Sequence, residues 1–194
     1  MKIFILIITV LLSSCTYKDK ENKNINVNTE PVKVEENQKN EPVEEEMGYA
    51  FTVVYDNSPN RVTNIKLACD YISGKVVLPN EEFSFNDTVG KRNAQKGFRE
   101  APVLVSGESK MGIGGGVCQV SSTIHLAALN AGLNITERHS HSKQVVYAAK
   151  GLDAAVEYGE MDFKFINNTT EPIYIYVWFD SDKIYSKIVT YRYK

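Results

Sequence analysis

Three consecutive glycines stand directly before an apolar stretch with helical spacing, and this junction constrains the fold of the 194-residue chain more than any other feature. Gly114 to Gly116 permit φ > 0 and a close approach of the backbone to other atoms. The stretch that follows has apolar residues at i, i+3, i+7 and i+11, namely Val117, Val120, Ile124 and Ala128. This spacing predicts a central helix with one buried face, which ends near Ala131-Gly132.

Cys118 falls in the first turn of this predicted helix. The N–H groups of a helix start lack intrahelical partners and the helix dipole favours negative charge there, so a thiol ionises more readily at this place. Free cysteines are also often buried for packing alone. The neighbourhood favours a nucleophile, because Ser121, Ser122 and Thr123 share the helix and a His-rich segment, RHSHS, follows about twenty residues downstream.

A second, amphipathic helix is predicted earlier in the chain. Ser58-Pro59 offers an N-cap and a proline at the first helical position. Four apolar residues then fall on one helical face: Val62, Ile65, Cys69 and Ile72. Gly74 follows as a C-cap, and we interpret Cys69 as a core residue because it lies on the apolar face.

Most of the remaining domain is predicted to form strands. The candidates are Tyr49 to Tyr55, Val76 to Leu78, Ala101 to Ser106, Lys143 to Ala148, Ala154 to Tyr158, Asp162 to Ile166, Ile173 to Phe179 and Ile184 to Tyr191. The last two are expected to form a hairpin that covers the core. One early helix, one central helix and a run of strands predict an α+β fold with a mostly antiparallel sheet.

The N-terminal part of the chain is predicted to be a targeting segment and a tether. Residues 1–15 combine one lysine, an apolar run and small residues before Cys15, which is typical of a secretory signal and resembles the bacterial lipobox. Lipid on Cys15 would anchor the protein to the extracytoplasmic face of the cell membrane. Residues 16–48, rich in Lys, Glu and Asn, are predicted to be disordered, and residues 49–194 to form one domain.

Charge excludes one class of partner. The net charge of −2 provides no basic footprint for nucleic acid. We expect a monomer.

Three histidines are available to a cysteine nucleophile. His125 lies seven residues beyond Cys118, on the same helical face but about 10 Å further along the axis, so we interpret it as a helix-face residue bonded to Ser121. His139 and His141 are two apart in an extended segment, and both rings are therefore expected to face the cysteine. Either one would act as the base.

A third polar group is needed to orient the imidazole of such a pair. Asp153, Asp162 and Glu137 are the candidates. Zinc, held by Cys118 and the two histidines of the H-x-H segment, is an alternative for which no fourth ligand is evident.

Several blocks of the sequence resemble the VanW-domain family in order and spacing, a family named after an accessory protein of glycopeptide-resistance clusters. The blocks are FSFNDTVGKRNAQKGFREAPVL, GGGVCQVSSTIHLAAL, ERHSHS, GLDAAVEYG and DFKFINNTTEPIYI. The resemblance runs from about Thr52 to about Val177, and GGGVCQVSST is highly specific.

The resemblance implies L,D-transpeptidation, in which a cysteine forms 3→3 cross-links in peptidoglycan. Cys118 would attack the carbonyl of the third residue of a donor stem tetrapeptide and expel D-Ala, and an amine of a neighbouring stem would resolve the thioester. His139 or His141 would be the general base. Of the acidic candidates for the third group, we place Asp153 with the catalytic residues and leave Asp162 and Glu137 open. The residues implied for the oxyanion-binding loop are Gly115, Gly116, Gln119 and Ser121. No cofactor is implied.

Two other functions fit the same residues. The first is a non-catalytic module that binds stem peptides or a protein partner, with the glycine loop as a recognition turn. The second is a thiol hydrolase that cuts stem peptides, because water and an amine compete for the same thioester. The reactivity of Cys118 relative to Cys69 separates a catalyst from a binding module.

Overall fold

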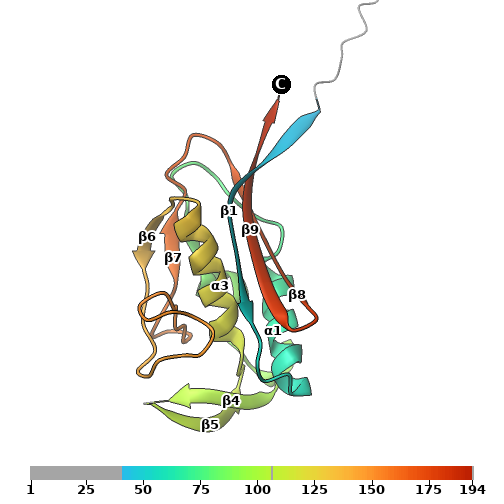
Figure 1. Cartoon of the computed structure of the whole chain (residues 1–194), viewed down its shortest axis with the longest axis vertical. Coiled ribbons are helices and arrows are strands. Elements are labelled where there is room, and N and C mark those ends of the chain that lie inside the picture. The colour runs from blue at the N-terminus through green and yellow to red at the C-terminus, as the bar shows by residue number, and fades with distance from the viewer. Residues whose placement is uncertain (1–40, 106, 194) are drawn as a thin grey trace, which may run out of the picture. The chain divides into compact units, whose positions relative to one another are not determined.

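A computed structural model describes residues 41–105 and 107–193, which lie within one compact unit (Figure 1). The predicted signal peptide, Cys15 and residues 16–40 of the predicted tether lie outside the described residues. The elements in chain order are β1 (Pro42–Val53), α1 (Pro59–Ile72), β2 (Lys75–Val77), β3 (Glu82–Ser84), α2 (Phe85–Val89), a 3₁₀ turn η1 (Ala94–Lys96), β4 (Glu100–Val105), β5 (Glu108–Ile113), α3 (Val117–Asn130), β6 (Asn134–Glu137), β7 (Lys164–Ile166), β8 (Ile173–Asp180) and β9 (Lys183–Tyr193). In the described ranges, no helix combines the length and apolar character needed to cross a membrane.

The strands of the described chain pair only in the antiparallel sense. The largest sheet has the order β1-β9-β8-β2, a second has the order β3-β7-β6, and β4 and β5 form a separate hairpin. The predicted α+β fold with a mostly antiparallel sheet is therefore confirmed. The predicted C-terminal hairpin is also confirmed, as β8 and β9.

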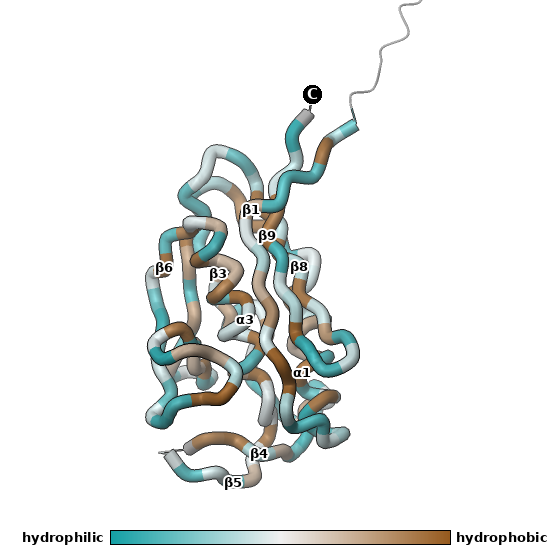
Figure 2. Tube along the Cα trace, in the orientation of Figure 1, coloured by the Kyte–Doolittle hydropathy of each residue, from teal (hydrophilic) through white to brown (hydrophobic). Residues whose placement is uncertain are grey.

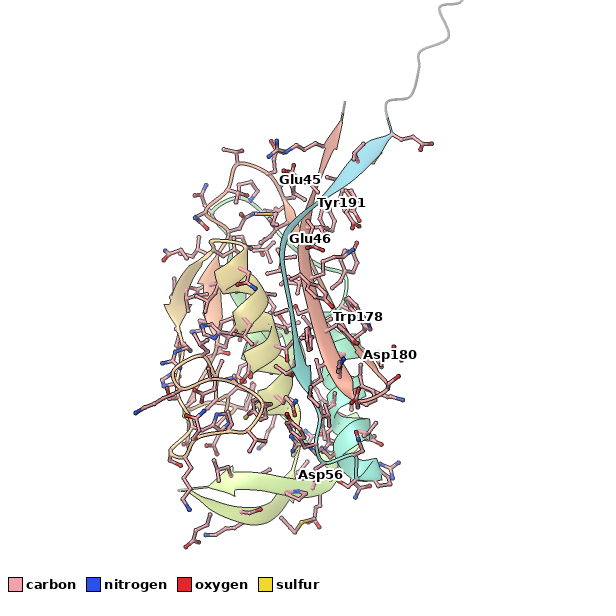
Figure 3. All side chains as sticks on the ribbon, viewed as in Figure 1. Glu45, Glu46, Asp56, Trp178, Asp180 and Tyr191 are labelled. Atoms are coloured by element: carbon pink, nitrogen blue, oxygen red, sulfur yellow. The ribbon has the colours of Figure 1, made fainter. Side chains whose placement is uncertain are left out.

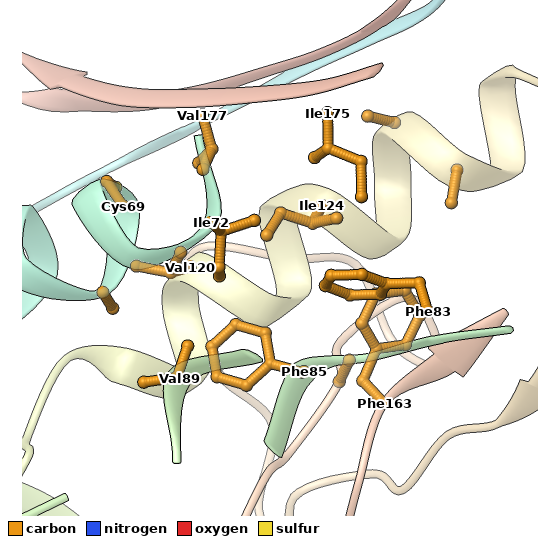
Figure 4. Close-up of a cluster of buried hydrophobic side chains, with 14 of the residues drawn as sticks. Cys69, Ile72, Phe83, Phe85, Val89, Val120, Ile124, Phe163, Ile175 and Val177 are labelled. Atoms are coloured by element: carbon orange, nitrogen blue, oxygen red, sulfur yellow. The ribbon is translucent and has the colours of Figure 1, made fainter. Parts of the chain in front are cut away.

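The core lies where α3 meets the large sheet and α1. Helix α3 contacts β1, β9 and β6, and α1 packs against β8 and α3. Figure 4 shows Val120 and Ile124 of α3 close to Ile72 of α1 and Ile175 of β8. The apolar stripe predicted for α3 is buried, and so is Cys69, at 2% exposure. Both predicted helices are confirmed.

Gly48 allows β1 to run directly against the backbone of α3. A Cβ atom built at Gly48 would lie 2.6 Å from the backbone nitrogen of Ala131 and would also collide with the carbonyl oxygen of Ala127. The register between β1 and β9 shifts between Glu46 and Gly48, which marks a β-bulge at this point. Strand β1 thus packs directly against the C-terminal end of α3.

The ordered domain begins earlier than the sequence predicts, because residues 42–48 belong to β1 and not to a tether. The first part of β1 pairs with the last part of β9, near Glu45 and Tyr191 in Figure 3. Two cross-strand ion pairs support it: Glu44–Lys187 at 2.6 Å and Glu45–Arg192 at 2.8 Å. Residues 42–48 show no alternation of apolar and polar residues. Backbone pairing and charged side chains hold this stretch in the sheet, so composition alone gives no sign of a strand.

The segment between β6 and β7, residues 138–163, differs most from the prediction, and we call it the β6–β7 loop. Lys143 to Ala148 forms no strand, and Ala154 to Tyr158 contributes only isolated bridges. The strand predicted from Asp162 shortens to β7. The short elements β3, α2, η1, β5 and β6 were not predicted, because three to six residues carry little periodicity.

The packing of α3 yields a stability prediction. Replacing Ile124, which is fully buried, with alanine leaves a cavity between α3 and β8. We expect Ile124→Ala to lower the free energy of unfolding by about 2–5 kcal/mol, measured by urea denaturation. Leu129→Ala is the matched control on the same helix, because Leu129 is 40% exposed, and we expect a change of about 1 kcal/mol or less. Equal losses in the two variants would contradict this description of the core.

Candidate active site

A cleft of about 950 Å³ opens at the N-terminal end of α3. Its walls come from the glycine loop, the first turn of α3, the β4–β5 hairpin and the β6–β7 loop. In Figure 2, much of β4 is hydrophobic and much of β5 is hydrophilic. Cys118 lines the cleft as a half-buried, free thiol in the first turn of the helix, as the sequence predicts.

His141 and Asp153 form a hydrogen-bonded pair next to Cys118. The Nδ1 atom of His141 lies 2.7 Å from Oδ2 of Asp153, and the backbone N–H of His141 donates to the same oxygen at 2.7 Å. Because Nδ1 is occupied by the carboxylate, Nε2 is the nitrogen that remains for the thiol. The Cys118 Sγ atom donates to the carbonyl oxygen of Val156 at 3.5 Å. Cys118, His141 and Asp153 thus have the arrangement of a nucleophile, a base and an orienting acid.

The pKa values of the pair shift in the directions that favour a thiolate and an imidazolium. Burial by itself raises the pKa of Cys118, but the hydrogen bond with His141 and the charges of His141 and Arg92 lower it below the ordinary value. Burial by itself lowers the pKa of His141, but Cys118 and Asp153 raise it. Each group therefore stabilises the charged form of the other.

Asp153 is also kept charged. Burial raises its pKa, but the hydrogen bonds from the backbone and ring of His141 lower it below the ordinary value. Arg138 donates to the backbone carbonyl of Asp153 at 2.7 Å and lies 3.8 Å from its carboxylate. The orienting group is thus held from both its backbone and its side chain.

His139 does not face the cysteine, so the expectation that both rings would do so is wrong. Its Nε2 atom lies 2.9 Å from Glu137 Oε1, and its carbonyl accepts from Ala155 in an isolated bridge. The chain at His139 to His141 is not a regular strand, and side chains two apart do not share one side there.

The other two candidates for the orienting group have structural contacts elsewhere. Asp162 accepts from the Ser84 hydroxyl at 2.6 Å and from the Asn86 backbone N–H at 2.9 Å, and so caps α2. Glu137 binds His139 and Lys164, each at 2.9 Å. Neither contacts His141 through these bonds.

The glycine loop brings the start of α3 close to β4. A Cβ atom at Gly115 would lie 2.5 Å from the carbonyl oxygen of Pro102, so no side chain fits there. Asn64 of α1 donates to the Gly115 carbonyl at 3.0 Å. Gly116 is the N-cap of α3 with φ 104°, a value that favours glycine. Asn64 was not singled out from the sequence, and nothing in its local pattern marks it.

The N–H group of Cys118 is the donor best placed for an oxyanion. The flanking N–H groups of Val117 and Gln119 donate to Gly114 and Gly116 at 3.1 and 3.0 Å, whereas that of Cys118 makes no such backbone bond among the described residues. A free N–H at a helix start, beside the sulfur, suits a developing oxyanion.

The expected roles of Gln119 and Ser121 in the oxyanion loop require correction. The buried Gln119 amide donates to Thr52 Oγ1 and the Val53 carbonyl and accepts from Arg61, so it ties α3 to β1 and α1. Ser121 is fully buried, and its hydroxyl donates to the Ala154 carbonyl at 2.6 Å. Both side chains thus hold the walls of the cleft together. Gln119 lines the cleft but its amide is engaged in these bonds, and Ser121 is not among the lining residues.

Ser122 adds to the anchoring of the β6–β7 loop. Its hydroxyl accepts from the Ala154 N–H at 2.9 Å and donates to the Cys118 carbonyl at 2.7 Å. His125 contributes further along α3, where Nδ1 lies 3.0 Å from the Leu152 carbonyl, so its expected bond to Ser121 is not found. These bonds place Asp153, and through it His141, beside the cysteine.

Two aromatic and three cationic side chains complete the lining of the cleft. Tyr147 and Tyr158 are the aromatic residues. The Tyr147 ring meets the His141 ring edge-on, with centroids 6.3 Å apart. Arg61, Lys91 and Arg92 also line the cleft, and the pair Lys91-Arg92 within GKRNAQKG is the signal that would have indicated a cationic wall.

The zinc alternative gains no support from the described residues. Within residues 41–105 and 107–193, no group of three or more His, Cys, Asp or Glu side chains is arranged to hold a metal ion.

A cysteine, a histidine and an aspartate above a glycine loop define an α+β domain built around a thiol site. The chain belongs to the VanW family, because the family model described as "VanW like protein" matches residues 60–189. The resemblance inferred from the sequence motifs is thereby confirmed.

Two curated proteins are similar to this chain. The "Uncharacterized protein YoaR" of Bacillus subtilis (strain 168) is 49% identical over 125 residues, which are 63% of this chain and 41% of that protein. The "Vancomycin B-type resistance protein VanW" of Enterococcus faecalis (strain ATCC 700802 / V583) is 29% identical over 147 residues, 71% of this chain and 51% of that protein. The chain thus spans about half or less of each relative's length. No solved structure matches.

The opposite pKa shifts of the two cysteines predict selective alkylation. Burial raises the pKa of Cys69 to about 12, whereas the pKa of Cys118 is lowered. We expect iodoacetamide near neutral pH to label Cys118 more than about tenfold faster than Cys69, measured by peptide mass spectrometry. In His141→Ala, the midpoint of the pH–rate profile of Cys118 moves to higher pH, because the imidazolium no longer stabilises the thiolate. An unchanged midpoint would contradict the pairing, and His139→Ala is the matched control.

Proposed function

We propose that this protein is a cysteine acyltransferase of the L,D-transpeptidase type, which joins peptidoglycan stem peptides through 3→3 cross-links. The observation that carries the proposal is the Cys118–His141–Asp153 arrangement at the cleft. A nucleophile with a lowered pKa and an oriented base next to a free N–H group is what acyl transfer requires.

The first half-reaction forms a thioester. The Cys118 thiolate attacks the carbonyl carbon of the third stem residue, and the Cys118 N–H stabilises the oxyanion. The bond between that carbon and the nitrogen of the terminal D-Ala then breaks. His141, protonated at Nε2 and held by Asp153, gives its proton to the departing amine, so D-Ala leaves with a neutral amino group.

The second half-reaction forms the cross-link. The amine of the third residue of a neighbouring stem attacks the thioester carbon, and neutral His141 takes its proton. The C–S bond breaks, a new amide bond forms, and the thiolate and imidazolium are restored. Water in place of the amine would release a tripeptide, which is the hydrolase outcome.

The substrate and the location come from the family and from the N-terminal sequence. One relative is named as a vancomycin B-type resistance protein. Residues 1–15 end in a lipobox-like sequence, so we propose that lipid on Cys15 anchors the protein on the extracytoplasmic face of the membrane, beside its substrate.

The activity is tested with disaccharide-tetrapeptide muropeptides and the purified full chain, followed by mass spectrometry. We expect the wild type to release D-Ala and form a 3→3 dimer, and Cys118→Ala to do neither. His141→Ala should lower the rate by about 10²–10⁴-fold, because the general acid–base group is lost. His139→Ala is the matched control and should stay close to wild type, since its ring is bound to Glu137.

Each other product pattern decides between functions. A tripeptide without dimer, absent in Cys118→Ala, would indicate the hydrolase. Substrate that stays intact but binds to the wild type would indicate a binding module. Activity that survives in Cys118→Ala would overturn the assignment of the nucleophile.

The anchor has its own test. We expect Cys15→Ser to move the protein out of the membrane fraction of cells that export it. Serine has no sulfur atom, so the thioether that carries the lipid cannot form. The readout is immunoblotting of membrane and released fractions. Retention of Cys15→Ser on the membrane after a carbonate wash would refute the lipid anchor.

A further inference from the structure

Two arginines flank the glycine loop, and neither forms an ion pair among the described residues. Arg61 of α1 and Arg92 of the α2–η1 connection both line the cleft. The ion pairs found in the described chain involve other residues. Guanidinium groups that form no ion pair and lie beside a nucleophile are suited to an anionic group of the substrate.

Arg92 is held rigidly while part of its guanidinium group stays available. Its Nη1 atom donates to Asn86 Oδ1 at 2.6 Å and to the Gly90 carbonyl at 3.0 Å. The side-chain stem passes over Gly114, where a Cβ atom would lie 3.1 Å from the Cβ of Arg92. The guanidinium carbon lies 5.8 Å from the centre of the Phe85 ring. Nε and Nη2 make no hydrogen bond to the described residues, so one edge of the fork is free.

Arg61 is engaged differently. Its Nη2 atom donates to Gln119 Oε1 at 3.0 Å, and its Nε atom is buried without a partner. The stem packs against Gly116, where a Cβ atom would lie 3.0 Å from Cγ of Arg61. Because Nε is closed to solvent, Arg61 has no free edge of the kind that Arg92 offers, and we assign it to the support of the glycine loop.

Arg92 is also close enough to Cys118 for its charge to act on the thiol. The carboxylates that line the same cleft, Glu157 and Glu160, are exposed and form no ion pair with Arg92. Burial lowers the pKa of Arg92, and the charges of Cys118, Asp162 and Glu157 act in the opposite direction without a direct contact. A ligand carboxylate one residue beyond the attacked carbonyl therefore has a planar, two-donor partner at this wall.

We propose that Arg92 binds the terminal carboxylate of the D-amino acid that Cys118 expels, and that it thereby selects stem peptides ending one residue after the attacked carbonyl. This inference rests on the proposed function. In a pentapeptide the carboxylate lies up to about 3.3–3.6 Å further along the chain, out of register with a fixed fork. Arg92 is thus a specificity residue that recognises both the charge and the position of the terminal carboxylate of the donor.

The experiment compares three donors on the full chain: a disaccharide-tetrapeptide with a free terminal carboxylate, the same molecule as a terminal amide, and the pentapeptide. The readout is the ratio of kcat/KM for the tetrapeptide acid to that for each of the other two donors, within each protein. A charge-assisted fork predicts a ratio of about 10–100 for the wild type. Because the ratio is taken within one protein, partial loss of folded material cancels.

Three variants separate the fork from general charge. Arg92→Gln should bring the ratio close to one, and Arg92→Lys should keep only part of it, because lysine retains the charge without the planar fork. Lys91→Gln removes the same charge from the cleft at an exposed neighbour and should retain the wild-type ratio. A wild-type ratio near one, or equal losses in Arg92→Gln and Lys91→Gln, would overturn the proposal while leaving transpeptidation intact.

A binding measurement makes the test independent of turnover. Cys118→Ala is titrated with the acid and with the amide by calorimetry, alone and combined with Arg92→Gln. We expect the acid to bind about 10–100-fold more tightly, and this preference to vanish in the double variant. If the wild type turned over no donor but still bound the acid more tightly than the amide, the proposed transpeptidation would be wrong and the carboxylate site at Arg92 would be supported. Absence of a preference, or binding of neither donor, would refute the site.

Discussion

The hydroxyl groups of Ser121 and Ser122 hold the β6–β7 loop against α3, and the geometry of the candidate active site depends on them. Both side chains are fully buried and bond to the backbone of Ala154. Buried polar groups of a loop without a strand ladder must find partners, and here the partners come from the helix that carries Cys118. Asp153 is the residue directly before Ala154. The same bonds that satisfy the loop therefore place Asp153 and His141 beside Cys118.

Burial and neighbouring charges shift the pKa values of Cys118 and His141 in opposite directions, and the effect of the charges is the larger. Burial alone would keep Cys118 a neutral thiol and His141 a neutral imidazole. Their mutual interaction, with Asp153 on the far nitrogen of the ring, shifts both towards the charged forms. The start of α3 adds an unpaired N–H group and a favourable dipole. A group that is half-buried, charged and paired is well suited to reversible covalent chemistry, because little reorganisation is needed when charge develops.

The motif pattern predicted that Cys118 begins a helix and predicted both major helices, because those depend on local spacing. Glycines before a 3.6-residue apolar repeat define α3 and the position of Cys118 without knowledge of any other element. The errors are concentrated in residues 42–48 and in the β6–β7 loop. In residues 42–48, charged residues are held in the sheet by pairing with β9. In the β6–β7 loop, apolar residues line the cleft or pack against α3 without forming a strand ladder. Composition and alternation report neither arrangement.

The sequence by itself determined that a free cysteine begins a central helix, that two histidines and several acids are available to it, and that the chain belongs to the VanW family. Only the tertiary structure decided that His141, and not His139, is the partner, and that Asp153 orients it. It also decided that Gln119 and Ser121 support the site, and that Arg92 has a free edge in the cleft. The physical reason is that helical periodicity is set by neighbours in sequence, whereas the choice among polar partners depends on which buried groups already have hydrogen bonds, and those come from distant parts of the chain.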